Sequence, residues 1–319
     1  MAAFVPFDNW NDYRTTSIKR VEGKDLSGKV MVITGATGSL GKEMAFALVS
    51  AGATVIMTGR TMAKLEKAKT DVLSRSDSAS ELKGSIELME LDLGSYDSIQ
   101  AFVAALQKAH GDGIDVFVNN AGYCPTSEFK ASKYDVELSF QSNFLSLVLL
   151  TELVLPLVTK KNGRLVHLTS MSHGDAPKPM DFTKIPSTKE TFGGYNKDYA
   201  ESKWLVTAYS AMLAKRGVTS VCADPGASPG SAMWDNQPLM IRIMARYVFR
   251  FLTKTATQAA ACPTYLAVAD TVESGGYYAS GVQYSGREDT NDPKEWAKVT
   301  EALAKTFPEK YQKYAIKVE

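Results

Sequence analysis

The repeated alternation of short apolar runs with longer helix-periodic stretches constrains the fold most. The runs are rich in Val, Ile and Leu, which is typical of strands buried on both faces of a parallel sheet. The stretches between them, such as SIQAFVAALQKAH at 98–110, have the 3.6-residue period of crossover helices. Repeated strand–helix–strand units predict an α/β fold: a doubly wound parallel sheet with helices on both faces, in a single domain. The predicted strands lie at 29–35, 53–59, 85–93, 114–122, 163–170 and 218–226.

The predicted Rossmann-like catalytic domain spans 29–286 of the 319 residues. Residues 1–28 form a polar extension with aromatic anchors, and 287–319 form a helical tail. Within the domain, 171–198 is long, punctuated by Pro and Gly and poor in periodicity, which indicates an insertion with a functional role. We expect the segment at about 227–253 to form a substrate lid.

Charge and cysteine content exclude several classes of protein. The 36 basic and 35 acidic side chains leave a net charge of +1, so nothing favours nucleic acid as a partner. Three cysteines without CxxC spacing argue against a disulfide framework or structural zinc and favour a reducing, cytoplasmic location. The N-terminus has no signal-peptide pattern. The apolar run 144–158 is shorter than the roughly 20 residues that a bilayer requires, so we expect no membrane span.

A glycine-rich turn joins the first predicted strand to the following helix. Its glycines allow backbone N–H groups to approach a pyrophosphate, and the helix N-terminus adds a favourable dipole. The spacing is not the GxGxxG fingerprint, and the alternative is that the glycines serve only close strand–helix packing. The expected cofactor contacts in this turn are Gly35, Thr37, Ser39, Leu40 and Gly41.

The end of the second predicted strand indicates which dinucleotide binds. An acidic residue there would hydrogen-bond a ribose 2′-hydroxyl and repel a 2′-phosphate. This chain has Gly59 followed by Arg60, whose guanidinium suits a phosphate. The pattern favours NADP(H) over NAD(H); the alternative is that Arg60 is a solvated loop charge. Lys42 and Lys64 are further basic residues nearby, although both are expected on exposed helix faces.

Two more strand ends carry expected cofactor contacts. Asp92, beside Leu93, is placed to accept a hydrogen bond from the adenine amino group, or alternatively to cap the next helix, for which Ser95 is an equally good candidate. The fourth strand closes on Asn119 and the run Asn120, Ala121 and Gly122, whose small residues allow a flat ring to approach. A plain strand-end turn has a similar composition.

Tyr199 and Lys203 stand four residues apart on one predicted helix face. An ammonium one turn away lowers the pKa of a phenol from its usual value near 10, so the pair can exchange a proton with a carbonyl or alcohol oxygen during hydride transfer. Ser170, at the end of the fifth strand, is placed to donate to the same oxygen. Asn143 lies in an apolar helix, either to hold a water that connects Lys203 to solvent or as a satisfied buried amide.

Together these motifs resemble the short-chain dehydrogenase/reductase family over roughly residues 27–285. The resemblance implies that Asn143, Ser170, Tyr199 and Lys203 form a catalytic tetrad, and that the NNAG run flanks the cofactor. The long interval before Tyr199 and the segment KTATQAA at 254–260 are similar to the retinol-dehydrogenase-like branch. The matching motifs are TGATGSLG, Asp92, NNAG, Asn143, Ser170, YAESK and Asp224–Pro225–Gly226, and the resemblance adds Pro225 and Gly226 to the cofactor contacts.

The family pattern also implies a homodimer through the helices that carry Asn143 and Tyr199, unless the insertion blocks it. The chain departs from the branch at Asp224, where His is common, at Thr169, and at the glycine turn, which reads GSLG. None of these changes removes a catalytic group.

The remaining candidates carry weaker signals. His167 lies in an apolar strand, and His173 is expected on the loop surface, with contact to substrate near the cleft as the alternative. With only three histidines and no paired carboxylates nearby, no metal site is predicted. Cys124 is expected to line the pocket as an inert thiol. The segment 239–252 places Arg242, Arg246 and Arg250 on one face of an otherwise apolar helix, which indicates either a lid over an apolar pocket or peripheral contact with a membrane.

The leading hypothesis is therefore an NADP(H)-dependent oxidoreductase that interconverts a small apolar alcohol and its aldehyde or ketone. One alternative is a non-catalytic NADP(H)-binding sensor, which usually has an eroded tetrad. Another is a reductase of a specialised biosynthetic pathway. The fold alone does not identify the substrate.

Overall fold

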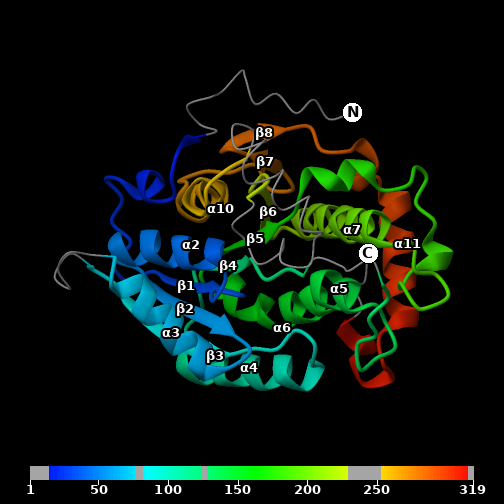
Figure 1. Cartoon of the computed structure of the whole chain (residues 1–319), viewed down its shortest axis with the longest axis horizontal. Coiled ribbons are helices and arrows are strands. Elements are labelled where there is room, and N and C mark those ends of the chain that lie inside the picture. The colour runs from blue at the N-terminus through cyan, green and yellow to red at the C-terminus, as the bar shows by residue number, and fades with distance from the viewer. Residues whose placement is uncertain (1–13, 76–81, 124–127, 229–252, 315–319) are drawn as a thin grey trace.

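The computed structural model describes residues 14–75, 82–123, 128–228 and 253–314. Among these residues, eight strands form one sheet in the order β3-β2-β1-β4-β5-β6-β7-β8 (Figure 1). Neighbours from β3 to β7 pair in parallel, and β8 pairs antiparallel with β7. The predicted doubly wound α/β fold is thus confirmed. The strands are β1 (Val30–Ile33), β2 (Thr54–Gly59), β3 (Ser85–Glu90), β4 (Val116–Asn119), β5 (Arg164–Leu168), β6 (Thr219–Asp224), β7 (Tyr277–Ala279) and β8 (Val282–Tyr284).

Helices cover both faces of the sheet, with α2 and α10 on one side and α4 and α6 on the other (Figure 1). Successive strand residues point to opposite faces. In β1, Val32 packs into the core beneath α4, α6 and α7, whereas Met31 and Ile33 pack into the core beneath α2, α3 and α10. The helices are α2 (Ser39–Ser50), α3 (Met62–Leu73), α4 (Tyr96–Ala109), α5 (Leu138–Phe140), α6 (Ser146–Lys160), α7 (Tyr195–Lys215), α9 (Ala256–Ala259), α10 (Ala261–Val268) and α11 (Pro293–Thr306).

The strand order reverses between β1 and β4, which each start a different half of the sheet. In open parallel sheets, ligands bind outside the carboxyl ends of the strands at such a switch point. The glycine turn follows β1 and the NNAG run follows β4, so both lie at this edge. The topology therefore brings the predicted cofactor motifs together.

One long apolar helix lies inside the protein. α5, the π-helical turn η3 (Gln141–Leu145) and α6 form a continuous helix, Leu138–Lys160, of 23 residues. It is long and apolar enough to cross a bilayer by length and composition, so the sequence argument from its length was wrong. Its most apolar stretch is 67% buried in the protein, and α6 packs against α4 and β4, as expected for a core helix.

The insertion and the tail pack against α6 and α7. The 3-10 turns η4 (Met171–Asp175) and η5 (Phe182–Lys184) lie in the insertion, and α11 contacts both α7 and η5 (Figure 1). The described part of the tail includes η9 (Glu309–Tyr314), which contacts α6. The N-terminal turn η1 (Ile18–Val21) packs on α2 and α10. Cys124 and the segment 239–252, including its arginines, lie outside the described residues.

Candidate active site

The glycine turn leaves the N-terminus of α2 available for an anion. Gly38 precedes the helix, so no side chain caps its first N–H groups. Ser39 Oγ is buried and has no hydrogen-bond partner among the described residues. A Cβ on Gly41 would lie 2.5 Å from Ala36 Cα, so glycine is needed for the close approach of turn and helix. Gly41 therefore does serve close packing. The uncapped N–H groups of α2, together with the Ser39 hydroxyl, also fit a pyrophosphate.

The NNAG run is tied directly to this turn. Asn120 Nδ2 donates to the carbonyl of Thr34 at 2.7 Å, and Ala121 N donates to Thr34 Oγ1 at 2.9 Å. Gly35 has a φ of +62°, and a Cβ there would lie 2.9 Å from Ala121 Cα. Because β1 and β4 are neighbours, these contacts hold the two cofactor motifs in one fixed arrangement.

Tyr199 and Lys203 lie on α7 and are both buried, with 9% and 4% of their surfaces exposed. Lys203 Nζ lies 5.6 Å from the centre of the Tyr199 ring and donates to the carbonyl oxygen of Leu168 at 3.0 Å. Leu168 is the last residue of β5, so this bond holds the ammonium at the carboxyl edge of the sheet. The structure therefore brings the phenol and the cation together where the sequence predicted.

Asn143 lies in η3 and is buried. Its Oδ1 accepts from Tyr123 N at 2.7 Å and its Nδ2 donates to Tyr123 O at 2.8 Å, so the amide is satisfied by the backbone after the NNAG run. A Cβ on Gly122 would lie 3.6 Å from Asn143 Oδ1 and 3.8 Å from Lys203 Nζ. Asn143 and Lys203 thus face the same glycine, and π-helical turns are frequent at functional sites.

The comparisons with known proteins point to one family. A family model described as short chain dehydrogenase matches residues 29–181. An uncharacterized oxidoreductase of Schizosaccharomyces pombe is 28% identical over 81% of this chain and 79% of its own length. Retinol dehydrogenase 13 of Homo sapiens is 28% identical over 81% of this chain and 78% of its own length.

This chain belongs to the short-chain dehydrogenase family. Within it, the retinol dehydrogenase 13 relatives place the chain in the retinol-dehydrogenase-like branch. The WW domain-containing oxidoreductase of Homo sapiens is 29% identical over 84% of this chain, which spans only 65% of that relative. The solved NADP active-site complex of RhlG from Pseudomonas aeruginosa has a TM-score of 0.62 at 22% identity, covering 80% of this chain and 95% of that one, which shows the shared fold.

The family motif at the end of β5 is also in place. Ser170 precedes η4, and its Oγ accepts from Ser172 N and donates to Ser172 Oγ, both at 3.2 Å. The next side chain, Met171, is 46% exposed, the most exposed of the large apolar side chains in the described part of the chain. An apolar surface therefore adjoins the expected carbonyl donor.

The Pro225–Gly226 turn follows β6 and is held by the residue that departs from the branch pattern. Asp224 Oδ1 accepts from Gly226 N at 2.7 Å, and its Oδ2 accepts from the Tyr277 hydroxyl at 2.6 Å. Gly226 has a φ of +75°, which favours glycine, and the buried Lys254 side chain packs against it. Burial lowers the pKa of Lys254. Asp224 thus shapes the turn through its own carboxylate.

Arg60 is exposed directly after β2, where the sequence placed it. The sequence missed the acid beside it: Glu90, the last residue of β3, pairs in register with Gly59. Its Oε1 accepts from Met62 N, the first N–H of α3, at 2.6 Å. Strand register across a parallel sheet is not visible in the sequence. Lys42 pairs with Asp71 at 2.9 Å, as expected for a residue on a helix face.

The structure bears on the alternative role of Asp92 as a helix cap. Ser95 caps α4 by accepting from Ser98 N, so Asp92 is not the cap, and its contact with adenine stays a prediction. Asp92 Oδ1 instead accepts from Gly94 N at 2.9 Å and orders the loop. The neighbouring Leu93 carbonyl accepts from Ser146 Oγ at 2.5 Å, which ties this loop to the start of α6.

Two histidines, His167 on β5 and His173 in η4, lie inside the protein. His173 is completely buried, so its predicted place on the loop surface is wrong. His167 is also completely buried, and burial lowers its pKa to about 3. The described residues contain no group of three or more His, Cys, Asp or Glu side chains arranged to hold a metal ion.

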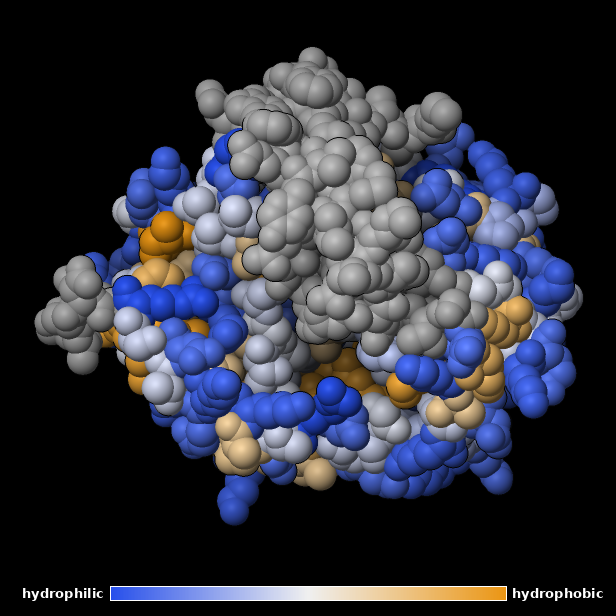
Figure 2. Space-filling view, in the orientation of Figure 1, coloured by the Kyte–Doolittle hydropathy of each residue, from blue (hydrophilic) through white to orange (hydrophobic). Residues whose placement is uncertain are grey.

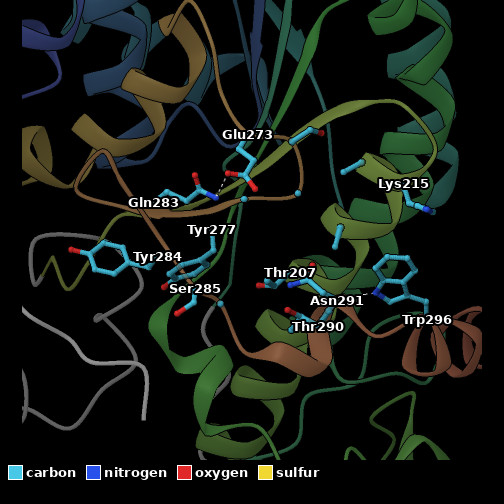
Figure 3. Close-up of a pocket in the computed structure, with 16 residues that line it drawn as sticks. Thr207, Lys215, Glu273, Tyr277, Gln283, Tyr284, Ser285, Thr290, Asn291 and Trp296 are labelled. Atoms are coloured by element: carbon cyan, nitrogen blue, oxygen red, sulfur yellow. Dashed lines mark hydrogen bonds between the residues drawn. The ribbon is translucent and has the colours of Figure 1, made fainter.

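A cavity of about 480 Å³ lies between α7, the β7–β8 hairpin and α11 (Figure 3). Its lining includes Thr207 and Lys215 of α7, Glu273 and Gln283, which are hydrogen-bonded to each other, and Trp296 of α11. None of the tetrad residues lines this cavity. On the face shown in Figure 2, apolar surface lies in a recess over the area where Figure 1 places α5 and α6.

Proposed function

We propose that this chain is an NADP(H)-dependent oxidoreductase that interconverts an apolar alcohol and its aldehyde or ketone. One observation carries the proposal: the buried pair of Tyr199 and Lys203 lies at the carboxyl edge of the sheet, where Lys203 bonds the end of β5 and faces Gly122. A phenol and an ammonium at this edge suit proton exchange with a substrate oxygen.

In the reductive direction, Tyr199 donates a proton to the carbonyl oxygen. The Lys203 ammonium stabilises the resulting phenolate, because opposite charges favour the ionised form. The Ser170 hydroxyl turns from Ser172 Oγ to donate a hydrogen bond to the same oxygen, and Asn143 fixes the backbone of Tyr123. The nicotinamide, when bound, supplies the hydride.

The choice of NADP(H) is supported by the ribose end of the cofactor site. Arg60 is exposed beside the N-terminus of α3, and no acidic residue stands at the end of β2 itself. The preference for an apolar substrate is supported by Met171, exposed next to Ser170. The prediction that 239–252 forms a lid or meets a membrane surface adds to this preference from the sequence alone.

A panel of alcohols, aldehydes and ketones, followed by NADPH absorbance, tests the proposal. The matched control is Tyr199→Phe, which keeps the ring and removes the proton donor. We expect the variant to bind NADPH with unchanged affinity and to lose most turnover, on the scale of 10²–10⁴-fold for a general acid. NADPH binding without turnover of any substrate by the parent protein would instead support the sensor hypothesis. Turnover by Tyr199→Phe at the parent rate would refute the assigned role of Tyr199.

A further inference from the structure

His173 is buried and has no role in the reaction proposed above, although several neighbours contact its side chain. The carbonyl oxygen of Ser170 accepts two hydrogen bonds from it, from the backbone N at 3.0 Å and from ring Nδ1 at 2.8 Å. Because a carbonyl only accepts, Nδ1 must carry a hydrogen. Arg287 N can only donate, and its bond to Nε2 at 3.4 Å means that Nε2 carries no hydrogen, so the ring is neutral. Both ring nitrogens are therefore matched in a single tautomer.

Arg287, whose N–H donates to Nε2, is itself fixed by contacts with other segments. The Arg287 guanidinium pairs with Asp289 at 2.6 Å and donates to the carbonyl oxygens of Ala176 and Pro177 in the insertion. Asp289 also accepts from Trp204 Nε1 of α7 at 3.0 Å. The C-terminal segment, the insertion and α7 thus meet around His173. Rotation of its imidazole would break bonds to two separate segments.

The His173 ring also links the backbone of Ser170 to the Pro225–Gly226 turn. It packs on Tyr277 with the ring centres 4.6 Å apart, and the Tyr277 hydroxyl donates to Asp224, which in turn holds Gly226 N. Burial and the Asp224 carboxylate both raise the pKa of Tyr277, so its hydroxyl stays a donor. His173 therefore lies between the backbone that presents Ser170 and the Pro225–Gly226 turn.

We propose that His173 is a positioning residue for the oxidoreductase reaction: its Nδ1–H holds the carbonyl of Ser170 and so sets where the Ser170 hydroxyl meets the substrate oxygen. This inference rests on the proposed function, since it acts through Ser170. Ser170 lies between β5 and η4, and the ring Nδ1 of His173 adds a second hydrogen bond to its carbonyl oxygen beside the one from His173 N. A misplacement of about 1 Å at a catalytic group can cost 10²-fold in rate.

Three substitutions separate positioning from packing. The amide nitrogen of His173→Asn occupies nearly the place of Nδ1 and keeps the donor to Ser170, whereas the amide of His173→Gln reaches the place of Nε2, and His173→Leu keeps neither. We expect kcat to fall about 10- to 100-fold in His173→Leu and His173→Gln, and to recover to within about threefold of the parent in His173→Asn. The KM for NADPH is expected to stay within about twofold of the parent value. Thermal unfolding shows which variants are folded.

The decisive comparison is made in a Ser170→Ala background. If His173 acts through Ser170, His173→Leu lowers kcat little further once the hydroxyl is gone, because effects through one group are not additive. Full additivity, or a His173→Asn variant as slow as His173→Leu, would overturn the inference. If His173→Leu does not fold, the kcat of His173→Asn is compared with that of His173→Gln. Equal values for these two variants would then overturn the inference. Loss of turnover in Tyr199→Phe together with parent kcat in His173→Leu would reject this role and leave the proposed function standing.

Discussion

Two opposite charges lie near the N-terminus of α3, where we propose that the cofactor is selected. Arg60 is the exposed cation, and the Glu90 carboxylate already occupies the first N–H of α3. A 2′-phosphate bound by Arg60 beside that N-terminus would meet this carboxylate. We therefore predict that Glu90→Gln binds NADPH more tightly than the parent, because the amide oxygen keeps the bond to Met62 N without the negative charge.

The exposure of both groups limits the size of the effect. One pair of unit charges roughly 5 Å apart in water interacts by about 0.8 kcal/mol, and a phosphate carries up to two charges. Relief of this repulsion predicts a gain of about 2- to 10-fold in NADPH affinity. Arg60→Ala removes charge-assisted hydrogen bonds that contribute about 1.5–3 kcal/mol, so NADPH affinity falls about 10- to 100-fold. NADH, which lacks the phosphate, should change little in either variant.

Dissociation constants for NADPH and NADH, measured by cofactor fluorescence at two salt concentrations, test these values. Both effects on NADPH should shrink at high salt, since exposed charges are screened. Glu87→Gln is the matched control, because Glu87 lies on the same strand but pairs with His110 at 2.9 Å, away from the strand end. Weaker NADPH binding by Glu90→Gln, or an equal gain for NADH, would refute the reasoning.

Three further predictions concern the rest of the site and the core. Gly41→Ala places a methyl 2.5 Å from Ala36 Cα, so calorimetry should show a loss of about 1–3 kcal/mol of stability, with weaker NADPH binding; unchanged values would contradict the close approach. Asn143→Ala leaves Tyr123 N and O without their partner, which predicts about 1–3 kcal/mol of destabilisation in urea as well as lost turnover. His167 has a folded pKa of about 3 against an unfolded value near 6.5, so the unfolded state binds more protons below about pH 6.5 and stability falls as the pH falls; between pH 6.5 and 4.5 this amounts to about 2.3 kcal/mol, and a folded His167→Phe variant with an equal slope would refute it.

Local chemistry explains what the sequence predicted well. Buried strands need continuous Val, Ile and Leu, and a glycine turn is needed where α2 approaches Ala36. The sheet and the glycine turn at its carboxyl edge could therefore be predicted from the sequence. The Tyr199 and Lys203 pair was visible for the same reason, since a four-residue spacing places two side chains on one helix face. Ser170 was predicted as a donor from its place at the end of the fifth strand, and Pro225–Gly226 came from the family resemblance. The structure places these residues after β5 and β6 at the same edge.

The amino-acid sequence by itself determined the strand and helix elements, the glycine turn and the i, i+4 pair, because each depends on residues close together along the chain. Only the tertiary structure decided that Glu90 lies opposite Gly59, that Asn143 bonds the backbone of Tyr123, and that His173 is buried between Ser170 and Tyr277. Apart from the bond between His173 and Ser170, those contacts join residues that lie well apart in the chain. Strand register and side-chain packing set them, and neither leaves a local pattern in the sequence.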